Sequence, residues 1–294
     1  MPTPPHRPAS LRGRLFRGSV VVRDGRLTPA QLRSTAWHRV FRDVYACATL
    51  ELTHEVRVVA ATRLLLPSAV ASGRSAAVLW GATGAAGAAD DVELTVPPGS
   101  SACTVPGIRL HRWPLAEDDI RERHGIRLTA PVRTAVDVGR EIGPVDESVA
   151  VVDALVARRT SDLAAVRLAA AAATGPRCRR SRRVAELADG LAGSPQETRV
   201  RLLLHASRLP RPVAQFEVHD GRGRLAARVD FAWPEHRLAL EYEGVWHGDP
   251  QQVGKDRARL NRLTACGWRV LFVTAADLRD PVGLVARIAA ELAR

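Results

Sequence analysis

The chain has 294 residues, of which 46% are hydrophobic and 25% are charged, a balance typical of globular proteins. This length allows two domains or more. The most apolar run, residues 168–173, is too short to span a bilayer, and the four cysteines form no CxxC or CxxH pair, which argues against a zinc finger or ribbon. Since the N-terminus has no secretory signal pattern, we expect a cytoplasmic protein with reduced cysteines and no membrane partner.

The formal net charge is +12, and nearly all of the positive charge is arginine because Lys255 is the only lysine. Such a charge suits a polyanionic partner, and DNA is the partner that we expect. An arginine-rich composition is also what a GC-rich genome produces, so the charge is nearly as well explained without any partner.

Residues 1–50 predict a partial winged-helix-like piece. Thr28 and Pro29 are placed as the cap and first residue of a helix, and residues 37–45 predict a small hairpin. A helix followed by a basic hairpin is how a winged helix-turn-helix ends. The run W-x-R-V-x-R-x-V-Y, which begins at Trp37, resembles the N-terminal piece of AbiEi-type antitoxins. Only one helix is expected before the hairpin, and the alternative is a small cap packed on the next domain.

Residues 51–190 predict a mixed α+β region. Its expected elements are helices at 53–66, 75–80, 145–157, 161–173 and 178–191 and strands at 92–96 and 108–113. A capped helix start at 129–137 resembles a recurring segment of the same AbiEi-like proteins. His111 and His124 are isolated, and the region shows no nucleophile–base pair, phosphate loop or metal-ligand spacing. We therefore expect a scaffold or recognition module.

Five arginines lie within the seven residues 177–183. A guanidinium group fits phosphate in a fixed fork geometry, so this run contains candidate nucleic-acid contacts. The four candidates are Arg179, Arg180, Arg182 and Arg183. A solvated helix end before a linker is an equally good interpretation of the run.

A glycine- and proline-rich break at 190–195 marks the start of a last domain, residues 191–294. Ser194 is placed to cap a new helix, and Glu197 would complete a capping box. The elements expected are a helix to about 207, strands at 216–218, 225–233 and 238–242, a helix at 251–265, a strand at 268–274 and a helix at 281–293. The order is therefore α-β-β-β-α-β-α.

The hairpin within 228–247 places acidic side chains on one face. If Glu235 and His236 are the loop residues, pairing is symmetric about them, so Asp230 lies opposite Glu241 and Glu243 shares their face. The apolar residues expected on the other face are Val229, Phe231, Leu238, Leu240 and Tyr242. Two carboxylates paired on a half-buried sheet need a metal ion or a proton between them.

This element order, with an acid in one strand and a second acid in its partner, resembles the core of the PD-(D/E)XK nucleases. Residues 194–291 look like the nuclease-like domain related to very-short-patch repair (Vsr) endonucleases. The resemblance is carried by the runs SPQE, VDFAWPEHRLALEYEGVWH and, starting at Asp256, D-x-x-R-x-x-x-L-x-x-x-G-W-R-V-L. It implies metal ligands at Asp230 and Glu241, a supporting acid at Glu197, a general base or water-positioning group at His247 and a phosphate contact at Arg259. Hard oxygen ligands suit Mg²⁺ or Mn²⁺.

One position departs from the superfamily pattern, because the usual lysine two residues after the second acid is Glu243. A glutamate cannot stabilise the negative charge that develops in the transition state. Either His247 or a second metal ion held by Glu243 takes that role, or the domain no longer cuts. In the last case, the acids form structural pairs with Arg228 and Arg259.

The expected fold class is α/β, α+β overall, with a restriction-endonuclease-like core at 191–294 preceded by the mixed region. The function that the sequence favours is a metal-dependent DNA endonuclease with an AbiEi-like N-terminal module. The main alternative is a non-catalytic DNA-binding regulator of the type IV antitoxin (AbiEi) kind with a degenerate nuclease fold. A nuclease that acts on RNA is a third hypothesis.

Overall fold

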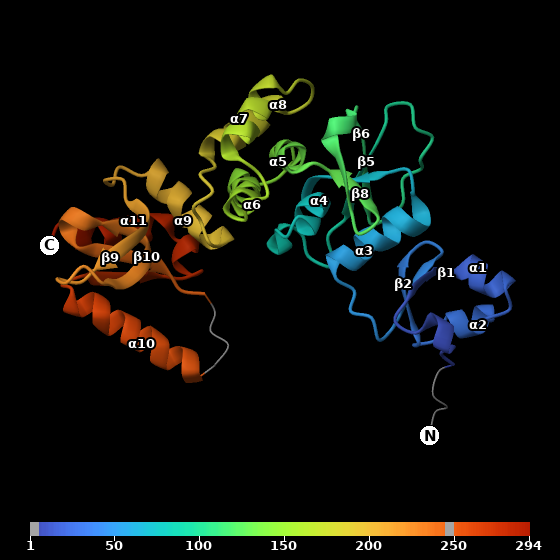
Figure 1. Cartoon of the computed structure of the whole chain (residues 1–294), viewed down its shortest axis with the longest axis horizontal. Helices are drawn as coiled ribbons and strands as arrows, with labels where there is room; N and C mark the ends of the chain where they lie inside the picture. The colour runs from blue at the N-terminus through green and yellow to red at the C-terminus, as the bar shows by residue number, and fades with distance from the viewer. Residues whose placement is uncertain (1–5, 245–249) are drawn as a thin grey trace. The chain divides into compact units, whose positions relative to one another are not determined.

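The computed structural model describes residues 6–244 and 250–294, which form helices and several sheets. The chain divides into two compact units, the first made of Met1–Glu141 and Thr160–Arg182 and the second of Ile142–Arg159 and Arg183–Arg294 (Figure 1). The α+β class expected from the sequence is confirmed. In the part of the chain that is described, no helix has the length and apolarity needed to cross a bilayer.

This division differs from the boundaries expected after residues 50 and 190. Helix α6 (Val145–Ala157) packs against α9 (Pro195–Ala206) in the second unit. The next helix, α7 (Leu163–Ala172), packs back on α5 (Pro131–Gly139) in the first unit. Helix α8 (Cys178–Leu187) then carries the chain from the first unit into the second. The division follows these packing contacts, which composition does not reveal.

A buried polar network fixes α6 to the second unit. The Asp153 carboxylate on α6 accepts hydrogen bonds at Oδ1 from the backbone N–H groups of Asp189 and Gly190, both 2.9 Å. Its Oδ2 accepts from Thr198 Oγ1 at 2.7 Å and Arg201 Nη2 at 2.8 Å, both on α9. Since a buried charge is tolerated only when it is paired and hydrogen-bonded, this network explains why α6 packs where it does.

The first unit begins with a three-stranded sheet in the order β1-β3-β2, and its hairpin has the predicted position. The elements are β1 (Leu15–Arg17), α1 (Gly18–Arg23), α2 (Pro29–Leu32), β2 (Trp37–Phe41) and β3 (Val44–Cys47). Thr28 caps α2 through a capping box with Gln31, as its sequence position predicted for the helix start. Helix α1 was not expected, because its N-cap, Arg17, makes no side-chain cap.

The larger sheet of the first unit has the strand order β6-β5-β4-β8-β7. Its strands are β4 (Val70–Ala71), β5 (Val92–Val96), β6 (Ile108–Arg112), β7 (Ile120–Arg123) and β8 (Ile126–Thr129). Strands β5 and β6 are parallel neighbours, as are β4 and β8. Helices α3 (His54–Ala60) and α4 (Gly73–Leu79) pack against β5. The β7–β8 hairpin was not predicted, since its outer strand is mostly exposed and lacks an apolar alternation.

The second unit is built on a four-stranded sheet in the order β12-β11-β10-β9. Its strands are β9 (Val213–His219), β10 (Leu225–Trp233), β11 (Leu238–Tyr242) and β12 (Arg269–Val273), and its last two helices are α10 (Pro250–Ala265) and α11 (Pro281–Leu292). From α9 onward, the element order is the predicted α-β-β-β-α-β-α. Strands β11 and β12 are parallel, because α10 forms the crossover between them.

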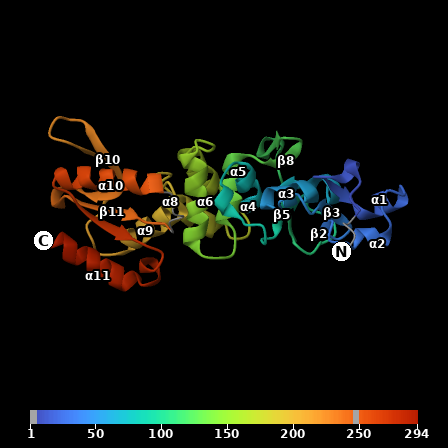
Figure 2. The ribbon, with the colours of Figure 1, turned by 90° about the horizontal axis from the view of Figure 1, so that it is seen from below.

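Helices cover both faces of this sheet. On one face, Leu204 of α9 and Ile288 of α11 pack with Leu238 and Leu240. On the other face, Leu263 of α10 packs with alanines of the central strands. Figure 2 shows α10 and α11 on opposite sides of these strands. Polar side chains lie at the edge of the sheet where β10 and β11 separate.

Candidate functional site

The β10–β11 hairpin has the predicted register. Phe231 pairs with Leu240, and the pairing continues to Trp233 and Leu238. The connection is longer than the expected two residues, because a 3-10 turn spans Pro234–His236 and Arg237 adopts a left-handed conformation with φ 46°. Both predicted metal ligands, one residue outward from the Phe231–Leu240 pair, therefore lie where the antiparallel ladder ends.

Asp230 lies between the separating strands. Its Oδ2 accepts a hydrogen bond of 2.9 Å from the backbone N–H of Tyr242, so a carboxylate takes the place of a strand carbonyl. This arrangement interrupts the side-chain alternation. Val229 consequently packs with Ala232 on the α10 face, and its expected place beside Phe231 is wrong. Burial raises the pKa of Asp230, while the Tyr242 hydrogen bond and the nearby arginines lower it.

Glu241 faces α10, and its side chain is 9% exposed. Arg259 of α10 forms an ion pair with its Oε2 through Nη1 and donates from Nη2 to the carbonyl oxygen of Arg228. Arg259 therefore lies beside the site, as predicted, and its contact in this structure is a carboxylate. This ion pair with Arg259 is one of the structural pairs foreseen for a domain that no longer cuts.

Glu197 approaches Asp230 from the first turn of α9. Ser194 caps this helix, since its Oγ accepts from the Glu197 backbone N–H at 3.2 Å. The Glu197 carboxylate accepts from the backbone N–H of Gly193 at 2.8 Å, one residue before the position that a capping box requires. Burial is the main cause that raises the pKa of Glu197, and the charge of Asp230 is the second. The predicted supporting acid is thus near the predicted ligand.

Gln215 is a member of this site that sequence reasoning missed. It has a left-handed backbone with φ 50°, and its Nε2 donates to Glu197 at 3.0 Å. Its neighbours Ala214 and Phe216 pair with Phe231 and Val229, which brings Gln215 opposite Asp230. No motif marks this position, and a register shift between Leu225 and Ala227 means that counting residues back from the turn at 220–223 would have placed Ala214 opposite Asp230.

A cation fits the chemistry of this carboxylate set. The pKa values of Asp230 and Glu197 are both raised, in the case of Glu197 partly by the negative charge of its neighbour. A hard divalent cation would relieve that repulsion. The three acids do not yet converge, however. In the described residues, Glu197, Asp230 and Glu241 form no group whose ligand atoms all lie within 4.8 Å of one another.

Glu243 and His247 are the two other predicted site residues. Glu243 follows β11, its side chain is exposed, and its backbone N–H donates to the carbonyl of Val273 at 2.7 Å. His247 lies outside the described residues. The roles assigned to Glu243 and His247 therefore stay predictions.

Two arginines of the run at 177–183 make hydrogen bonds that stabilise the fold. Arg180 donates to the carbonyl of Gly139 at 2.8 Å, at the end of α5. Arg182 donates to the carbonyl of Ala170 and, at 2.9 Å, to that of Ala173, at the end of α7. Both side chains satisfy helix C-terminal carbonyls, which otherwise have no intrahelical partner. These bonds favour the structural interpretation for Arg180 and Arg182.

The other two candidates of the run, Arg179 and Arg183, are exposed. Arg183 lies 3.8 Å from Glu186 on the same helix. An exposed ion pair of this kind contributes little stability, so both guanidinium groups are accessible to solvent. The predicted phosphate-binding set thus narrows to Arg179 and Arg183.

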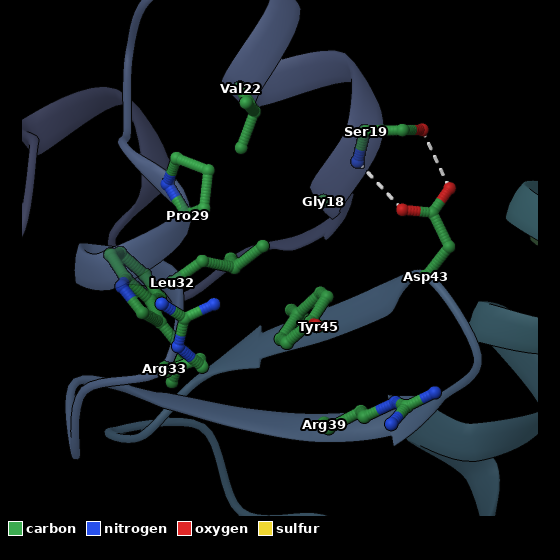
Figure 3. A pocket seen from close by; sticks show the side chains of 10 residues that line it. Gly18, Ser19, Val22, Pro29, Leu32, Arg33, Arg39, Asp43 and Tyr45 are labelled. Carbon is green, nitrogen blue, oxygen red and sulfur yellow. Dashed lines mark hydrogen bonds between the residues drawn. The ribbon is translucent and has the colours of Figure 1, made fainter.

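The N-terminal piece carries a pocket of about 710 Å³ between α1, α2 and the β2–β3 hairpin (Figure 3). Arg33 and Arg39 line it together with Asp43, whose carboxylate accepts from the Ser19 backbone N–H and hydroxyl, both at 2.6 Å. Helix α2 has only four residues. A recognition helix must present several side chains to a DNA groove, and a helix of four residues offers few of them.

One further polar group was missed by sequence reasoning. Ligand atoms of Glu93, His111 and Glu141 lie within 4.8 Å of one another in the first unit, and this group could hold a metal ion. His111 was interpreted as isolated, and that interpretation is wrong. The three residues come from separate segments of the chain, so no local spacing could have revealed them.

The chain is thus a two-unit α+β protein, and its second unit has a carboxylate site around Asp230 at one edge of a sheet. Comparison with known proteins finds two Mycobacterium tuberculosis proteins, named uncharacterized protein Rv2248 and uncharacterized protein MT2308, each 33% identical over 275 residues. The match covers 90% of this chain and 95% of each relative. The chain belongs to the family of these mycobacterial proteins. No family model matches it, and no solved structure does either.

Proposed function

We propose that the second unit hydrolyses phosphodiester bonds of DNA with the help of Mg²⁺ or Mn²⁺. The observation that carries the proposal is the position of Asp230, whose carboxylate occupies the gap where β10 and β11 separate. Glu241 from the neighbouring strand and Glu197 from α9 lie beside that gap. Acids from three separate elements thus border one sheet edge.

Each residue has a role in this proposal. Asp230 and Glu241 would hold the cation, and Glu197 would support it, with its carboxylate oriented by Gly193 and Gln215. A bound divalent cation lowers the pKa of an attacking water and neutralises charge on the phosphate. Arg259 balances the charge of Glu241 before the cation binds. Once the cation takes over that carboxylate, the Arg259 guanidinium would be available to a phosphate oxygen.

The main rival is a DNA-binding regulator that does not cut. The ion pair between Arg259 and Glu241 favours this regulator, because the predicted metal ligand Glu241 already has a guanidinium partner, as a purely structural ion pair would. Glu243 favours it too, since the superfamily pattern has a lysine there. Against it stands the four-residue α2, which is too short for a recognition helix.

The test is nicking of supercoiled plasmid DNA by the full chain, with Mg²⁺, with Mn²⁺ and with a chelator. We expect the wild type to nick only with metal and Asp230→Asn to lose about 100-fold or more of the rate, because removing one group that stabilises the transition state costs that much. Glu217→Gln, an exposed acid on β9, is the matched control and should nick like the wild type.

Two outcomes would separate the hypotheses. If wild type and Asp230→Asn both bind DNA and neither nicks any substrate, the regulator is correct and the hydrolase proposal fails. If the wild type degrades single-stranded RNA and leaves plasmid intact, the chemistry stands and the substrate class changes. Equal nicking by the two proteins would show that the activity does not come from this site.

A further inference from the structure

The cluster of Glu93, His111 and Glu141 belongs to the first unit, whereas the carboxylate site on β10 and β11 belongs to the second. Glu93 is on β5 and His111 on β6, and the parallel register pairs Glu93 with Arg109 and Thr95 with His111. Alternation therefore puts Glu93 and His111 on the same face of the sheet. Glu141 reaches them from the end of α5. The tertiary fold thus brings two carboxylates and one imidazole together.

The backbone makes room for this cluster. Gly73, at the start of α4, has φ +52°, and a Cβ placed on it would lie 1.8 Å from Glu93 Oε2. The same oxygen accepts a hydrogen bond of 3.0 Å from the backbone N–H of Arg74. Any residue other than glycine at position 73 would displace the Glu93 carboxylate. The side chains of Glu93 and Glu141 are only 4% and 7% exposed.

Neighbouring side chains orient all three groups. Arg74 Nε lies 3.3 Å from Glu141 Oε2, and Arg109 Nη1 lies 3.4 Å from Glu93 Oε1. The His111 ring stacks on Trp113 at 4.5 Å between centroids, and it makes no hydrogen bond to any residue in the described ranges. Metal ligands are commonly oriented by such outer contacts, and an imidazole without another partner keeps a nitrogen for coordination.

A shared proton is the competing explanation for the two carboxyl groups. Burial and a hydrogen bond with Glu141 raise the pKa of Glu93 to about 9. Two buried carboxylates need either a proton or a cation between them. A proton would be shared by the two carboxyl groups and would make no use of His111. A metal ion would use all three residues, so the imidazole is what distinguishes the two explanations.

We propose that Glu93, His111 and Glu141 bind a divalent transition-metal ion of the Zn²⁺ or Mn²⁺ kind. Three protein ligands leave a coordination position for water or a substrate atom. The imidazole favours transition metals over Mg²⁺ and Ca²⁺, which take oxygen ligands. This site is independent of the proposed nuclease centre, since it shares no residue with it.

An incoming cation would have to displace Arg109, which is the more exposed of the two arginines beside these carboxylates. Its side chain is 50% exposed and lies 4.0 Å from the exposed Asp91 as well as near Glu93 and Glu141. The guanidinium group can therefore move toward Asp91 and solvent. Since it is a positive charge beside the ligands, removing it should strengthen metal binding. A purely structural ion-pair network would not show that effect.

The test uses the full chain, stripped with a chelator and then equilibrated with Zn²⁺ or Mn²⁺. We would measure metal content after gel filtration and follow Co²⁺ binding by visible absorption. We expect His111→Ala to bind one equivalent less than wild type, with the affinity of this site falling by more than the roughly 10–100-fold that loss of an outer-shell partner costs. His111→Asn, checked by circular dichroism, guards against a folding defect.

Two matched variants complete the experiment. Asp230→Asn removes only the ligand of the other unit and should keep the equivalent that His111→Ala loses. Arg109→Gln should bind the ion more tightly than wild type. The proposal is overturned if folded His111 variants bind as much Zn²⁺ and Mn²⁺ as wild type, or if wild type binds neither ion in the first unit. In the latter case, the carboxyl pair holds a proton.

Discussion

Single carboxylates in this chain differ mainly in how their charge is balanced. Asp153 has four hydrogen-bond donors on its two oxygens. Asp137, on α5, has Arg133 Nε at 2.9 Å from Oδ1, while its buried Oδ2 has no hydrogen-bond partner in the described part of the chain. A buried aspartate is therefore fully hydrogen-bonded in the second unit, at Asp153, and only partly hydrogen-bonded in the first unit, at Asp137.

Asp137 should make the stability of the first unit depend on pH. Burial raises its pKa from 3.8 to about 6, although Arg133 lowers it. A raised pKa means that the folded state binds the proton more tightly. The stabilisation is therefore complete below pH 3.8 and is lost as pH rises to about 6.

Asp137→Asn should remove this loss of stability with rising pH, because asparagine does not ionise. Relative to the variant, wild type should lose up to roughly 3 kcal/mol of unfolding free energy across that interval, from a shift of about two units. Urea denaturation at several pH values measures it, with the exposed Asp118→Asn as control. Parallel curves for wild type and Asp137→Asn would contradict the assignment.

At the scale of elements, helix caps position the acids. Ser194 caps α9, which carries Glu197 toward Asp230 in its first turn. The sequence predicted this cap correctly, because capping depends on residues three positions apart. Gln215 was not predictable in this way, because its place depends on pairing between β9 and β10.

Ser194→Ala should destabilise the second unit by about 1 kcal/mol, the usual loss for an N-cap. The backbone N–H of Glu197 would lose its acceptor. Ser194→Asn should restore most of the stability, since asparagine caps about as well as serine. Guanidinium denaturation followed by circular dichroism measures both variants. Equal stability of Ser194→Ala and wild type would show that the cap contributes nothing.

At the scale of the whole molecule, each unit has its own hydrophobic core. Leu94 and Leu128 are central to one, and Leu204 and Leu240 to another. Units with separate cores can unfold separately. We therefore expect calorimetry to show two transitions, one of which responds to changes in the Asp153 network.

Asp153→Ala should lower only the transition of the second unit. Removing one partner of a buried ion pair costs about 3–5 kcal/mol, and Asp153 and Arg201 are 1% and 4% exposed. Asp146→Ala, on the same helix α6, removes a half-exposed pair with Arg199 and should cost about 1 kcal/mol or less. A lowered first-unit transition in Asp153→Ala would contradict the division into units.

The sequence by itself determined the local features of this protein. The caps at Thr28 and Ser194, the register of Phe231 with Leu240 and the element order from α9 to α11 all depend on neighbouring residues or on one hairpin. Periodicity and capping report such short-range physics directly.

Only the tertiary structure decided which distant residues meet. In the folded chain, Asp153 of α6 bonds to residues of the second unit, and Arg180 and Arg182 bond to carbonyls at helix ends. His111 lies close to two glutamates, Glu93 and Glu141. These contacts depend on strand order and on helices returning across the chain. A buried charge selects its partner by proximity and desolvation, and neither quantity exists until the chain has folded.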